Sequence, residues 1–515
     1  MTGAEALVAT LAAAGVRACF ANPGTSEMHL VAALEREPRI RTVLCLHEGV
    51  AAGAADGWGR MTGWPAAVLL HLGPGYANAI ANLHNARRAR TPTIAIVGEH
   101  AGSHRALDAP LASDIAGLAR PNSAWIGMPE RPAEVGPAAA EAVRASLADG
   151  GGNASLVLPA DCAWGGPAEP GPVVLPPGRA AVPPARVHAL AEAVREAARP
   201  MVLLGGHAAD ARGLAAAARL AARGLRIACD TFVPRLPRGE GHFAPERLPY
   251  FPEAASEALA AVDCLLTVGT RPPVAFFAYP GRPSGTLAPE GCAVHALAAP
   301  GEDGPAALGM LADLLSAPEA GPAAAHAPPN APEGPASPAA AGLALARHMP
   351  TDAIVSDDAV TAGAALYVTT ASARRHDWLM LTGGAIGQGL PLAVGAAIAC
   401  PERKVVALSG DGAALYTPQA LWTMAREALD ILVLVFANHG YAILEIERAR
   451  MGAGGNRPRS PLFALDAPAI DWVALAAGLG VPAERCLTAG ALDRAIAEGM
   501  ARRGPRLIEV AWTVS

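Results

Sequence analysis

The sequence has few aromatic residues, few charged residues and no long apolar run. Only 4% of its 515 residues are aromatic and 17% are charged, whereas 52% are hydrophobic. So few large side chains predict an interior filled by close backbone packing, and so much apolar material excludes a globally disordered chain. No stretch approaches the roughly 18 apolar residues that cross a membrane, and no basic segment opens the chain. We therefore expect a cytoplasmic protein without membrane contact.

Basic runs and paired cysteines are missing as well. The formal net charge is −6, and lysines and arginines do not cluster, so nucleic acid is not expected as a partner. None of the eight cysteines belongs to a Cys-x-x-Cys pair, which argues against zinc and iron–sulfur sites. We interpret the cysteines as buried free thiols in a reducing compartment.

Glycine and proline are abundant, at 55 and 47 residues, and they gather in two stretches, 165–184 and 317–340. Neither stretch has a helical or strand period, so both are predicted to be linkers. Between them, short apolar runs alternate with alanine-rich helical patterns, which indicates βαβ crossovers. We predict an α/β protein with three doubly wound parallel-sheet domains, at residues 1–165, 185–316 and 341–515. The expected strands are 42–46, 66–70, 93–97, 201–204, 264–268, 353–356, 404–408, 431–435 and 507–510.

The most informative segment of the third block is Gly410-Asp411-Gly412, which lies between a predicted strand and a predicted amphipathic helix. The next strand leads to Asn438 and Gly440. A carboxylate, an amide oxygen and a main-chain oxygen are hard ligands of the kind that Mg²⁺ prefers, and Mg²⁺ keeps coordination positions for phosphate oxygens. We therefore predict a Mg²⁺–diphosphate clamp made by Asp411, Asn438 and the main-chain oxygen of Gly440. A tight turn without function is the alternative.

This arrangement of strand, Gly-Asp-Gly, helix, strand and asparagine resembles the signature of thiamine diphosphate (ThDP)-dependent enzymes, and the resemblance covers the whole chain. It is nearest to the branch that contains acetolactate synthase and benzoylformate decarboxylase. The resemblance implies ThDP and Mg²⁺ as cofactors and a homodimer or dimer of dimers. It also implies decarboxylation or carboligation of a 2-oxo acid through C2 ylide attack, CO₂ loss and an enamine intermediate. An aldehyde or a second 2-oxo acid would be the acceptor in a carboligation.

The resemblance gives Glu48 a catalytic and cofactor-binding role. Glu48 follows a predicted strand and begins an alanine- and glycine-rich helix. A glutamate at this place in the family hydrogen-bonds the aminopyrimidine ring of the cofactor, and it comes from a different subunit than the residue equivalent to Asp411. The structural alternative is a helix N-terminal charge stabilised by the helix dipole.

Further cofactor contacts are implied for the third block. Ile386, in a glycine-rich run with Gly384, takes the place of the apolar residue that lies beneath the cofactor, although these glycines could also serve close helix packing. The turn that contains Ala359 and Val360 is expected to bind the diphosphate. Relatives have hydroxyl residues in this turn, so here backbone N–H groups, together with Thr361, would have to bind the diphosphate. The other expected contacts are Gly410, Gly412, Ala413 and Tyr441.

Three residues of the first block are expected near the substrate. Thr25 follows an Asn-Pro-Gly turn and matches a residue that contacts the substrate carboxylate, although it or Ser26 could equally be a helix N-cap. His71 matches a proton-relay histidine, while a histidine at the end of a buried strand can also be a core residue. His100 stands where relatives place a glutamine or histidine facing the cofactor. The second active-site histidine of benzoylformate decarboxylase has no counterpart, because residues 273–278 are apolar.

Two other functions stay open at this point. An acetolactate synthase large subunit would condense two pyruvates, and a catalytically inactive homologue would bind or regulate. The presence of Glu48, Asp411 and Asn438 argues against loss of activity. FAD, which the middle domain of acetolactate synthase holds, is compatible with the sequence, but no complete nucleotide fingerprint accompanies Gly205-Gly206.

Overall fold

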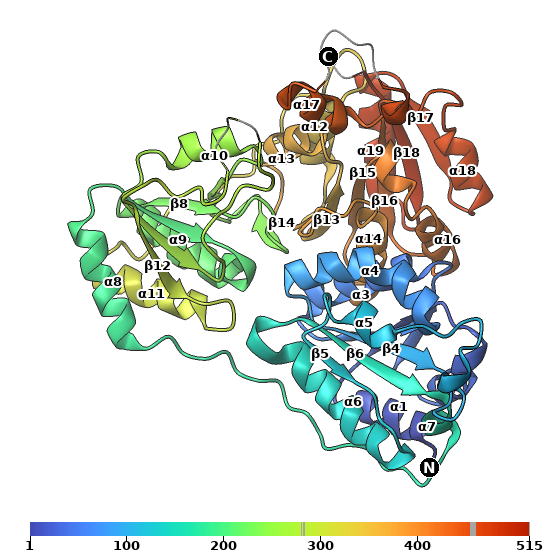
Figure 1. Cartoon of the computed structure of the whole chain (residues 1–515). Coiled ribbons are helices and arrows are strands. Elements are labelled where there is room, and N and C mark those ends of the chain that lie inside the picture. The colour runs from blue at the N-terminus through green and yellow to red at the C-terminus, as the bar shows by residue number, and fades with distance from the viewer. Residues whose placement is uncertain (280, 282–283, 454–459, 514–515) are drawn as a thin grey trace.

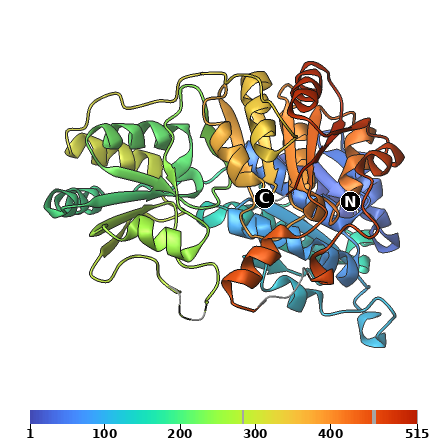
Figure 2. The same ribbon diagram turned by 90° about the horizontal axis from the view of Figure 1, so that it is seen from above.

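The computed structural model describes residues 1–279, 281, 284–453 and 460–513. The chain forms three α/β domains, and each is built around a sheet of its own (Figure 1). The N-terminal domain, in blue and cyan, lies against the C-terminal domain, in orange and red, and the middle domain lies to one side of both. The view from above shows the same three bodies (Figure 2). The predicted fold class is confirmed.

The N-terminal domain has a six-stranded parallel sheet in the order β2-β1-β3-β4-β6-β5. Every residue of β3 and β4 is buried, which explains why these strands appear in the sequence as continuous apolar runs. The strands are β1 (Ala18–Ala21), β2 (Arg41–Leu44), β3 (Ala66–Leu70), β4 (Thr93–Glu99), β5 (Trp125–Gly127) and β6 (Asn153–Pro159). The helices are α1 (Gly3–Ala13), α2 (Met28–Glu35), α3 (Glu48–Thr62), α4 (Leu72–Ala89), α5 (Ile115–Ala119), α6 (Pro132–Leu147) and α7 (Ala160–Trp164).

The middle domain has a five-stranded parallel sheet in the order β10-β8-β7-β11-β12. Its strands are β7 (Pro200–Leu204), β8 (Arg226–Cys229), β10 (Glu246–Arg247), β11 (Cys264–Val268) and β12 (Ala293–Ala298). Its helices are α8 (Pro184–Glu196), α9 (Ala211–Ala222), α10 (Pro252–Leu259) and α11 (Gly304–Leu314). At the carboxyl ends of these strands, Thr270 donates a hydrogen bond to Asp230, with 2.5 Å between the oxygens.

The C-terminal domain has a seven-stranded sheet in the order β17-β18-β16-β15-β13-β14-β9. Its strands are β13 (Ala353–Asp358), β14 (His376–Met380), β15 (Val405–Gly410), β16 (Ile431–Ala437), β17 (Ala483–Cys486) and β18 (Arg506–Ala511). Its helices are α12 (Pro338–His348), α13 (Gly363–Thr369), α14 (Gly389–Ala399), α15 (Asp411–Ala414), α16 (Gln419–Arg426), α17 (Ala442–Arg450), α18 (Trp472–Gly478) and α19 (Ala489–Ala501). The edge strand β9 (Leu236–Arg238) comes from the middle of the chain and pairs antiparallel with β14.

The two glycine- and proline-rich stretches connect the domains. Residues 165–183 and 316–337 contain no helix and no named strand. The first of them runs along the outside of the molecule from the N-terminal domain to α8 (Figure 1). Both stretches therefore lack regular secondary structure of their own. Strand β9, in contrast, lies among elements of the middle domain in the sequence but pairs with the sheet of the C-terminal domain.

The N- and C-terminal domains meet along α3 and α14, which lie side by side (Figure 1). The backbones approach so closely that a Cβ atom on Gly395 would lie 1.8 Å from the carbonyl oxygen of Ala54. Val50 of α3 and Leu392 of α14 belong to the same buried core. Small residues thus replace large side chains at this interface, as the scarcity of aromatics predicts.

The cysteines agree with the prediction of free thiols. All eight are free, and six are fully buried. Burial raises the pKa of Cys19 to about 12, which keeps its thiol protonated and unreactive. Among the described residues, no helix combines the length and apolar character that a bilayer span requires.

Candidate active site

Asp411 is the first residue of α15, directly after β15 ends at Gly410. Its side chain is buried, with 3% of the residue exposed. The N–H of Gly412 donates to Oδ1 at 2.8 Å, and the N–H of His439 donates to Oδ2 at 2.7 Å. Burial raises the pKa of Asp411, and the two backbone donors counteract part of that rise. Within the described residues, no lysine or arginine forms an ion pair with this carboxylate.

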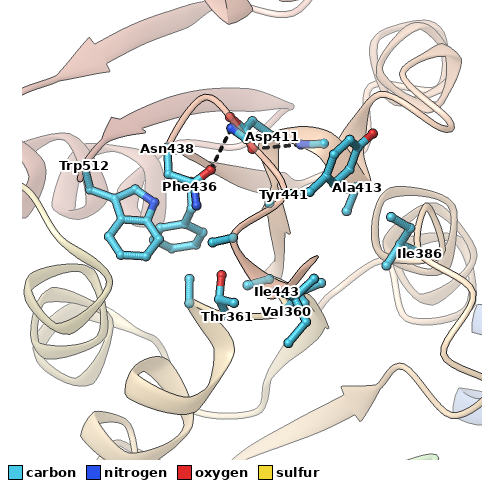
Figure 3. Close-up of a pocket in the computed structure, with 16 residues that line it drawn as sticks. Val360, Thr361, Ile386, Asp411, Ala413, Phe436, Asn438, Tyr441, Ile443 and Trp512 are labelled. Atoms are coloured by element: carbon cyan, nitrogen blue, oxygen red, sulfur yellow. Dashed lines mark hydrogen bonds between the residues drawn. The ribbon is translucent and has the colours of Figure 1, made fainter. Parts of the chain in front are cut away.

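Asn438 follows β16, the neighbour of β15, and lies beside Asp411 at the same edge of the sheet (Figure 3). Gly440, two residues later, lines the same pocket. The side-chain oxygen of Asn438 accepts the N–H of Gly440 at 3.0 Å. His439, between them, has a positive φ of 53°. The three predicted metal ligands therefore come together around one pocket. They are not a cluster of histidine, cysteine and acidic residues, and no such cluster of three or more occurs in the described part of the chain.

The pocket lies entirely within the C-terminal domain (Figure 3). It collects nearly all of the cofactor contacts that the sequence predicts for this domain. Gly384 is the exception: it is exposed and does not line the pocket. The residues that line the pocket are Ala359, Val360, Thr361, Ala362, Ile386, Gly410, Asp411, Gly412, Ala413, Phe436, Asn438, Gly440, Tyr441, Ala442, Ile443 and Trp512.

The turn after β13 forms one wall of the pocket. Val360 in this turn has φ 49°, which is unusual for a β-branched residue and costs on the order of 1–3 kcal/mol. Such backbone strain often marks a ligand site, because the surrounding structure must hold it in place. The side chains of Ala359 and Val360 offer no hydrogen-bond donor, and the N–H of Ala359 already donates to Oδ1 of Asp357 at 3.1 Å. The donors that this wall can present are therefore the N–H groups of Val360 and Thr361 and the hydroxyl group of Thr361.

The loop that carries Ile386 is held by an acidic residue that sequence reasoning missed. Oδ2 of Asp358 accepts the N–H groups of Gly387 at 2.8 Å and Gly389 at 3.2 Å. Burial raises the pKa of Asp358 to about 7. The only signal in the sequence was its place beside Ala359, two residues after the predicted strand 353–356.

Glu48 begins α3 and is 6% exposed. Its Oε2 accepts a hydrogen bond from the side-chain amide of Asn78 at 3.0 Å, and His47 caps the helix by accepting the N–H of Gly49. Glu48 does not line the pocket around Asp411, whose lining residues all lie between positions 359 and 512. Within a single chain, Glu48 therefore lies outside the pocket that contains Asp411.

The predicted substrate-side residues gather at the carboxyl ends of three adjacent strands, β1, β3 and β4. Nδ1 of His71 lies 2.9 Å from Oε2 of Glu27 and 3.1 Å from Oγ of Ser26. Glu27 is only 1% exposed, and sequence reasoning gave it no role. Its place two residues after the Asn-Pro-Gly-Thr turn was the available signal. Thr25 is exposed and forms no described side-chain hydrogen bond.

His100 follows β4, next to the strand that leads to His71. Its Nε2 is buried without a hydrogen-bond partner among the described residues, and its ring centroid lies 5.4 Å from that of His104. The structure thus brings His71 into a polar cluster with Glu27 and Ser26, while the role of His100 stays a prediction.

Comparison with known proteins agrees with this geometry. Residues 1–115 match the model for the thiamine pyrophosphate enzyme, N-terminal TPP binding domain, and residues 359–510 match the C-terminal TPP binding domain. The chain is also 30% identical to benzoylformate decarboxylase of Pseudomonas aeruginosa, over 96% of each chain. The chain belongs to the thiamine pyrophosphate enzyme family.

Other members of the thiamine pyrophosphate enzyme family are similar over the full length. The chain is 48% identical, over 99% of each chain, to a Mycobacterium tuberculosis protein that carries the provisional name acetolactate synthase large subunit IlvX. Among solved structures, the ThDP-dependent 4-hydroxybenzoylformate decarboxylase of Rhodococcus jostii RHA1 superposes with a TM-score of 0.87 at 25% identity, covering all of both chains. The middle domain is therefore part of the same architecture.

Proposed function

We propose that the chain is a ThDP- and Mg²⁺-dependent enzyme that decarboxylates a 2-oxo acid and can join the remaining acyl unit to an acceptor. The observation that carries this proposal is Asp411: a buried carboxylate, without a described lysine or arginine partner, that faces a pocket beside Asn438. A buried carboxylate is costly unless a positive charge accompanies it. A divalent cation fits that requirement, and the amide and carbonyl oxygens beside it are suitable further ligands.

The residues present fit the cofactor. Asp411, Asn438 and the main-chain oxygen of Gly440 would hold Mg²⁺, and the backbone of residues 359–361 with that of Ala413 would face the diphosphate. When bound, ThDP supplies a carbon nucleophile and an electron sink for the release of CO₂. Glu48 would hold a proton on the pyrimidine ring. His71, oriented by Glu27, would move protons at the substrate, and Thr25 would contact the substrate carboxylate.

The active unit would be a dimer, or a pair of dimers. The pocket around Asp411 contains no residue of the N-terminal domain, so Glu48 of one subunit would complete the pocket of the other. Glu48 and Asp411 of one chain would then serve two different sites. The arrangement requires a two-fold contact between N- and C-terminal domains of different subunits.

Mixing two inactive variants tests this arrangement. Glu48→Gln and Asp411→Ala should each have about 1% of the wild-type activity or less when expressed alone. In a mixed dimer, one site receives both defects and the other receives none. Equal amounts of the two chains, co-expressed or unfolded and refolded together, should form mixed dimers in about half of all cases. About one quarter of all sites would then be intact, and about one quarter of the wild-type activity should return. If both residues served the site of their own chain, mixing would restore nothing.

A second candidate function is acetolactate synthesis from two pyruvates, which the 48% identity to a protein named as such a large subunit favours. Product analysis with pyruvate separates the two candidates, because acetolactate supports the second and a released aldehyde the first. A flavin absorbance in the purified protein would also support the second. A panel of 2-oxo acids, assayed for CO₂ release with and without an aldehyde, would define the donor and acceptor.

The free and buried thiols are compatible with a reducing compartment, and we place the enzyme in the cytoplasm. Binding of ThDP and Mg²⁺ is the most direct test of the proposal as a whole. Calorimetric titration should show saturable binding that requires both. Absence of binding at millimolar ThDP would leave only an inactive homologue.

A further inference from the structure

Helix α4 carries three asparagines on one face. Asn78, Asn82 and Asn85 are spaced four and three residues apart, so their side chains lie one above the other over about 10 Å of helix. Asn82 is 3% exposed and Asn85 is fully buried. Polar amides in such positions need hydrogen-bond partners, and the partners found here belong to the two predicted halves of the active site.

The first two asparagines reach the start of α3. The amide of Asn78 donates to the carboxylate of Glu48, as described above, and the amide of Asn82 donates to the carbonyl oxygen of Gly49 at 2.7 Å. These contacts fix the position of the first turn of the helix. They therefore fix the direction in which Glu48 can present its second carboxylate oxygen.

Asn85 reaches the loop of the C-terminal domain that carries Ile386. Its Nδ2 donates to the carbonyl oxygen of Ala385 at 2.8 Å, and its Oδ1 accepts the N–H of Ala385 at 3.2 Å. One side chain thus pairs with both backbone groups of Ala385, as a neighbouring strand would. The backbone of the loop lies so close to Asn85 that a Cβ atom on Gly383 would be 2.3 Å from its Oδ1.

The two ends of this arrangement are joined directly. Nδ2 of Asn85 also donates to Oδ1 of Asn82 at 3.1 Å, so a continuous chain of hydrogen bonds runs from Gly49 through both asparagines to Ala385. The pairing with Ala385 fixes which end of the Asn85 amide is the donor, because an N–H group needs an acceptor and a carbonyl needs a donor.

We propose that Asn82 and Asn85 are positioning residues that set the Glu48 helix and the Ile386 loop relative to each other and so couple two active sites. This inference rests on the proposed function, in which Glu48 and Ile386 of one chain serve different sites of the dimer. The hydrogen-bond chain lies within one subunit. A displacement of the loop in one site is therefore transmitted to the glutamate of the other.

Asn85→Asp tests the positioning role with little change in shape. The new carboxylate oxygen would face the carbonyl oxygen of Ala385, which repels it. We expect faster amide hydrogen exchange in the 382–387 segment of the protein without cofactor, and a ThDP Kd about tenfold higher, equivalent to about 1.4 kcal/mol. Unchanged exchange and unchanged Kd would overturn the proposal.

Asn153→Ala is the matched control. Asn153 is equally buried and donates to the carbonyl oxygens of Leu83 and Asn122, but among the described residues it forms no hydrogen bond with the Ile386 loop. We expect this variant to lower Tm while the ThDP Kd and the exchange of the 382–387 segment stay at the wild-type values. An equal rise of Kd in both variants would show that Asn85 acts only through general stability.

The mixed dimer of Glu48→Gln and Asp411→Ala tests the coupling between sites. Its single intact site uses the Ile386 loop of the Glu48→Gln subunit and the glutamate of the Asp411→Ala subunit. Asn85→Asp in the former subunit should act on the loop directly. In the latter subunit it can act only through Asn82 and Gly49, and we expect a two- to fivefold loss of kcat there.

The outcomes separate the proposals. If Asn85→Asp in the Asp411→Ala subunit leaves kcat unchanged, coupling between the sites is absent. If the mixed dimer has no activity at all, the shared site of the proposed function is wrong, and the coupling falls with it. The hydrogen-exchange result in the unliganded protein depends on neither and judges the positioning role by itself.

Discussion

The N-terminal and C-terminal domains place a buried carboxylate in the same position, as the first residue of a helix that follows a sheet strand, but they hold it differently. The carboxylate of Asp411 accepts hydrogen bonds from two backbone N–H groups. Glu48 accepts one hydrogen bond from the side chain of Asn78, and within the described residues its Oε1 has no donor. A carboxylate held by the backbone has a fixed position, which suits a metal ion. A carboxylate with one oxygen left over suits a hydrogen bond to a ligand.

The largest effect is expected for Asp411→Ala. The variant should lose Mg²⁺ and ThDP binding by more than about 100-fold, since loss of outer-shell partners alone costs metal sites 10–100-fold. Isothermal titration calorimetry measures the change. Asp430→Ala removes a carboxylate that pairs with Lys404 at the other end of the neighbouring strand, and it should bind the cofactor normally. Equal binding by both variants would contradict the assigned metal site.

Glu48→Gln should separate binding from turnover. Glutamine keeps an oxygen that can accept the hydrogen bond from Asn78, so the ThDP Kd should change only a few-fold. It cannot serve as an acid or base, and kcat should fall by about 10²–10⁴. Titration and steady-state kinetics on the same preparation would show the contrast with Asp411→Ala. A kcat near the wild-type value would be incompatible with the proposed role.

A smaller effect is expected at the substrate side of the N-terminal domain. Glu27→Gln removes the charge that orients His71 while keeping a similar shape. We expect kcat to fall about 10- to 100-fold, within the lower range of proton-transfer contributions, with an unchanged ThDP Kd. His71→Ala should give a similar loss, and the double variant should lose little more. Additive losses would mean that the two residues act independently.

The smallest effect on catalysis is expected in the middle domain, where Asp230, directly after β8, accepts a hydrogen bond from Thr270. Desolvation raises the pKa of Asp230 to about 7. The folded protein then binds a proton more tightly than the unfolded chain, so stability falls as the pH rises from about 4 to 7. Asp230→Asn should remove this loss. Its Tm relative to wild type should therefore be higher at pH 8 than at pH 5, as measured by thermal denaturation at both values.

Nine of the strands and the pair formed by Asp411 and Asn438 could be predicted because their signals are local. Buried parallel strands appear as apolar runs, and polar residues at their carboxyl ends stand out against them. Asp411 and Asn438 were found in this way, and the structure brings them to one pocket. Glu48 was found through family resemblance, because a glutamate that begins a helix is common in any protein.

Other features depend on partners far away in the sequence. Asn85 pairs with Ala385, 300 residues later, and its sequence neighbours give no sign of that contact. A role for Glu27 follows only from its hydrogen bond with His71, which lies at the end of a different strand. The three-residue strand β9 is shorter than any periodicity can reveal, and its partner β14 lies in another domain.

Because β9 pairs with β14 of the C-terminal sheet, the polypeptide cannot be divided freely between the domains. A fragment that starts at the second linker would contain β14 without its outer partner. The row of backbone groups on β14 that now meets Leu236 and Arg238 would be left open, and such an open edge invites pairing between molecules. The cofactor-binding half should thus be prone to aggregation when it is expressed alone, and any attempt at truncation would have to retain the segment around residues 236–238.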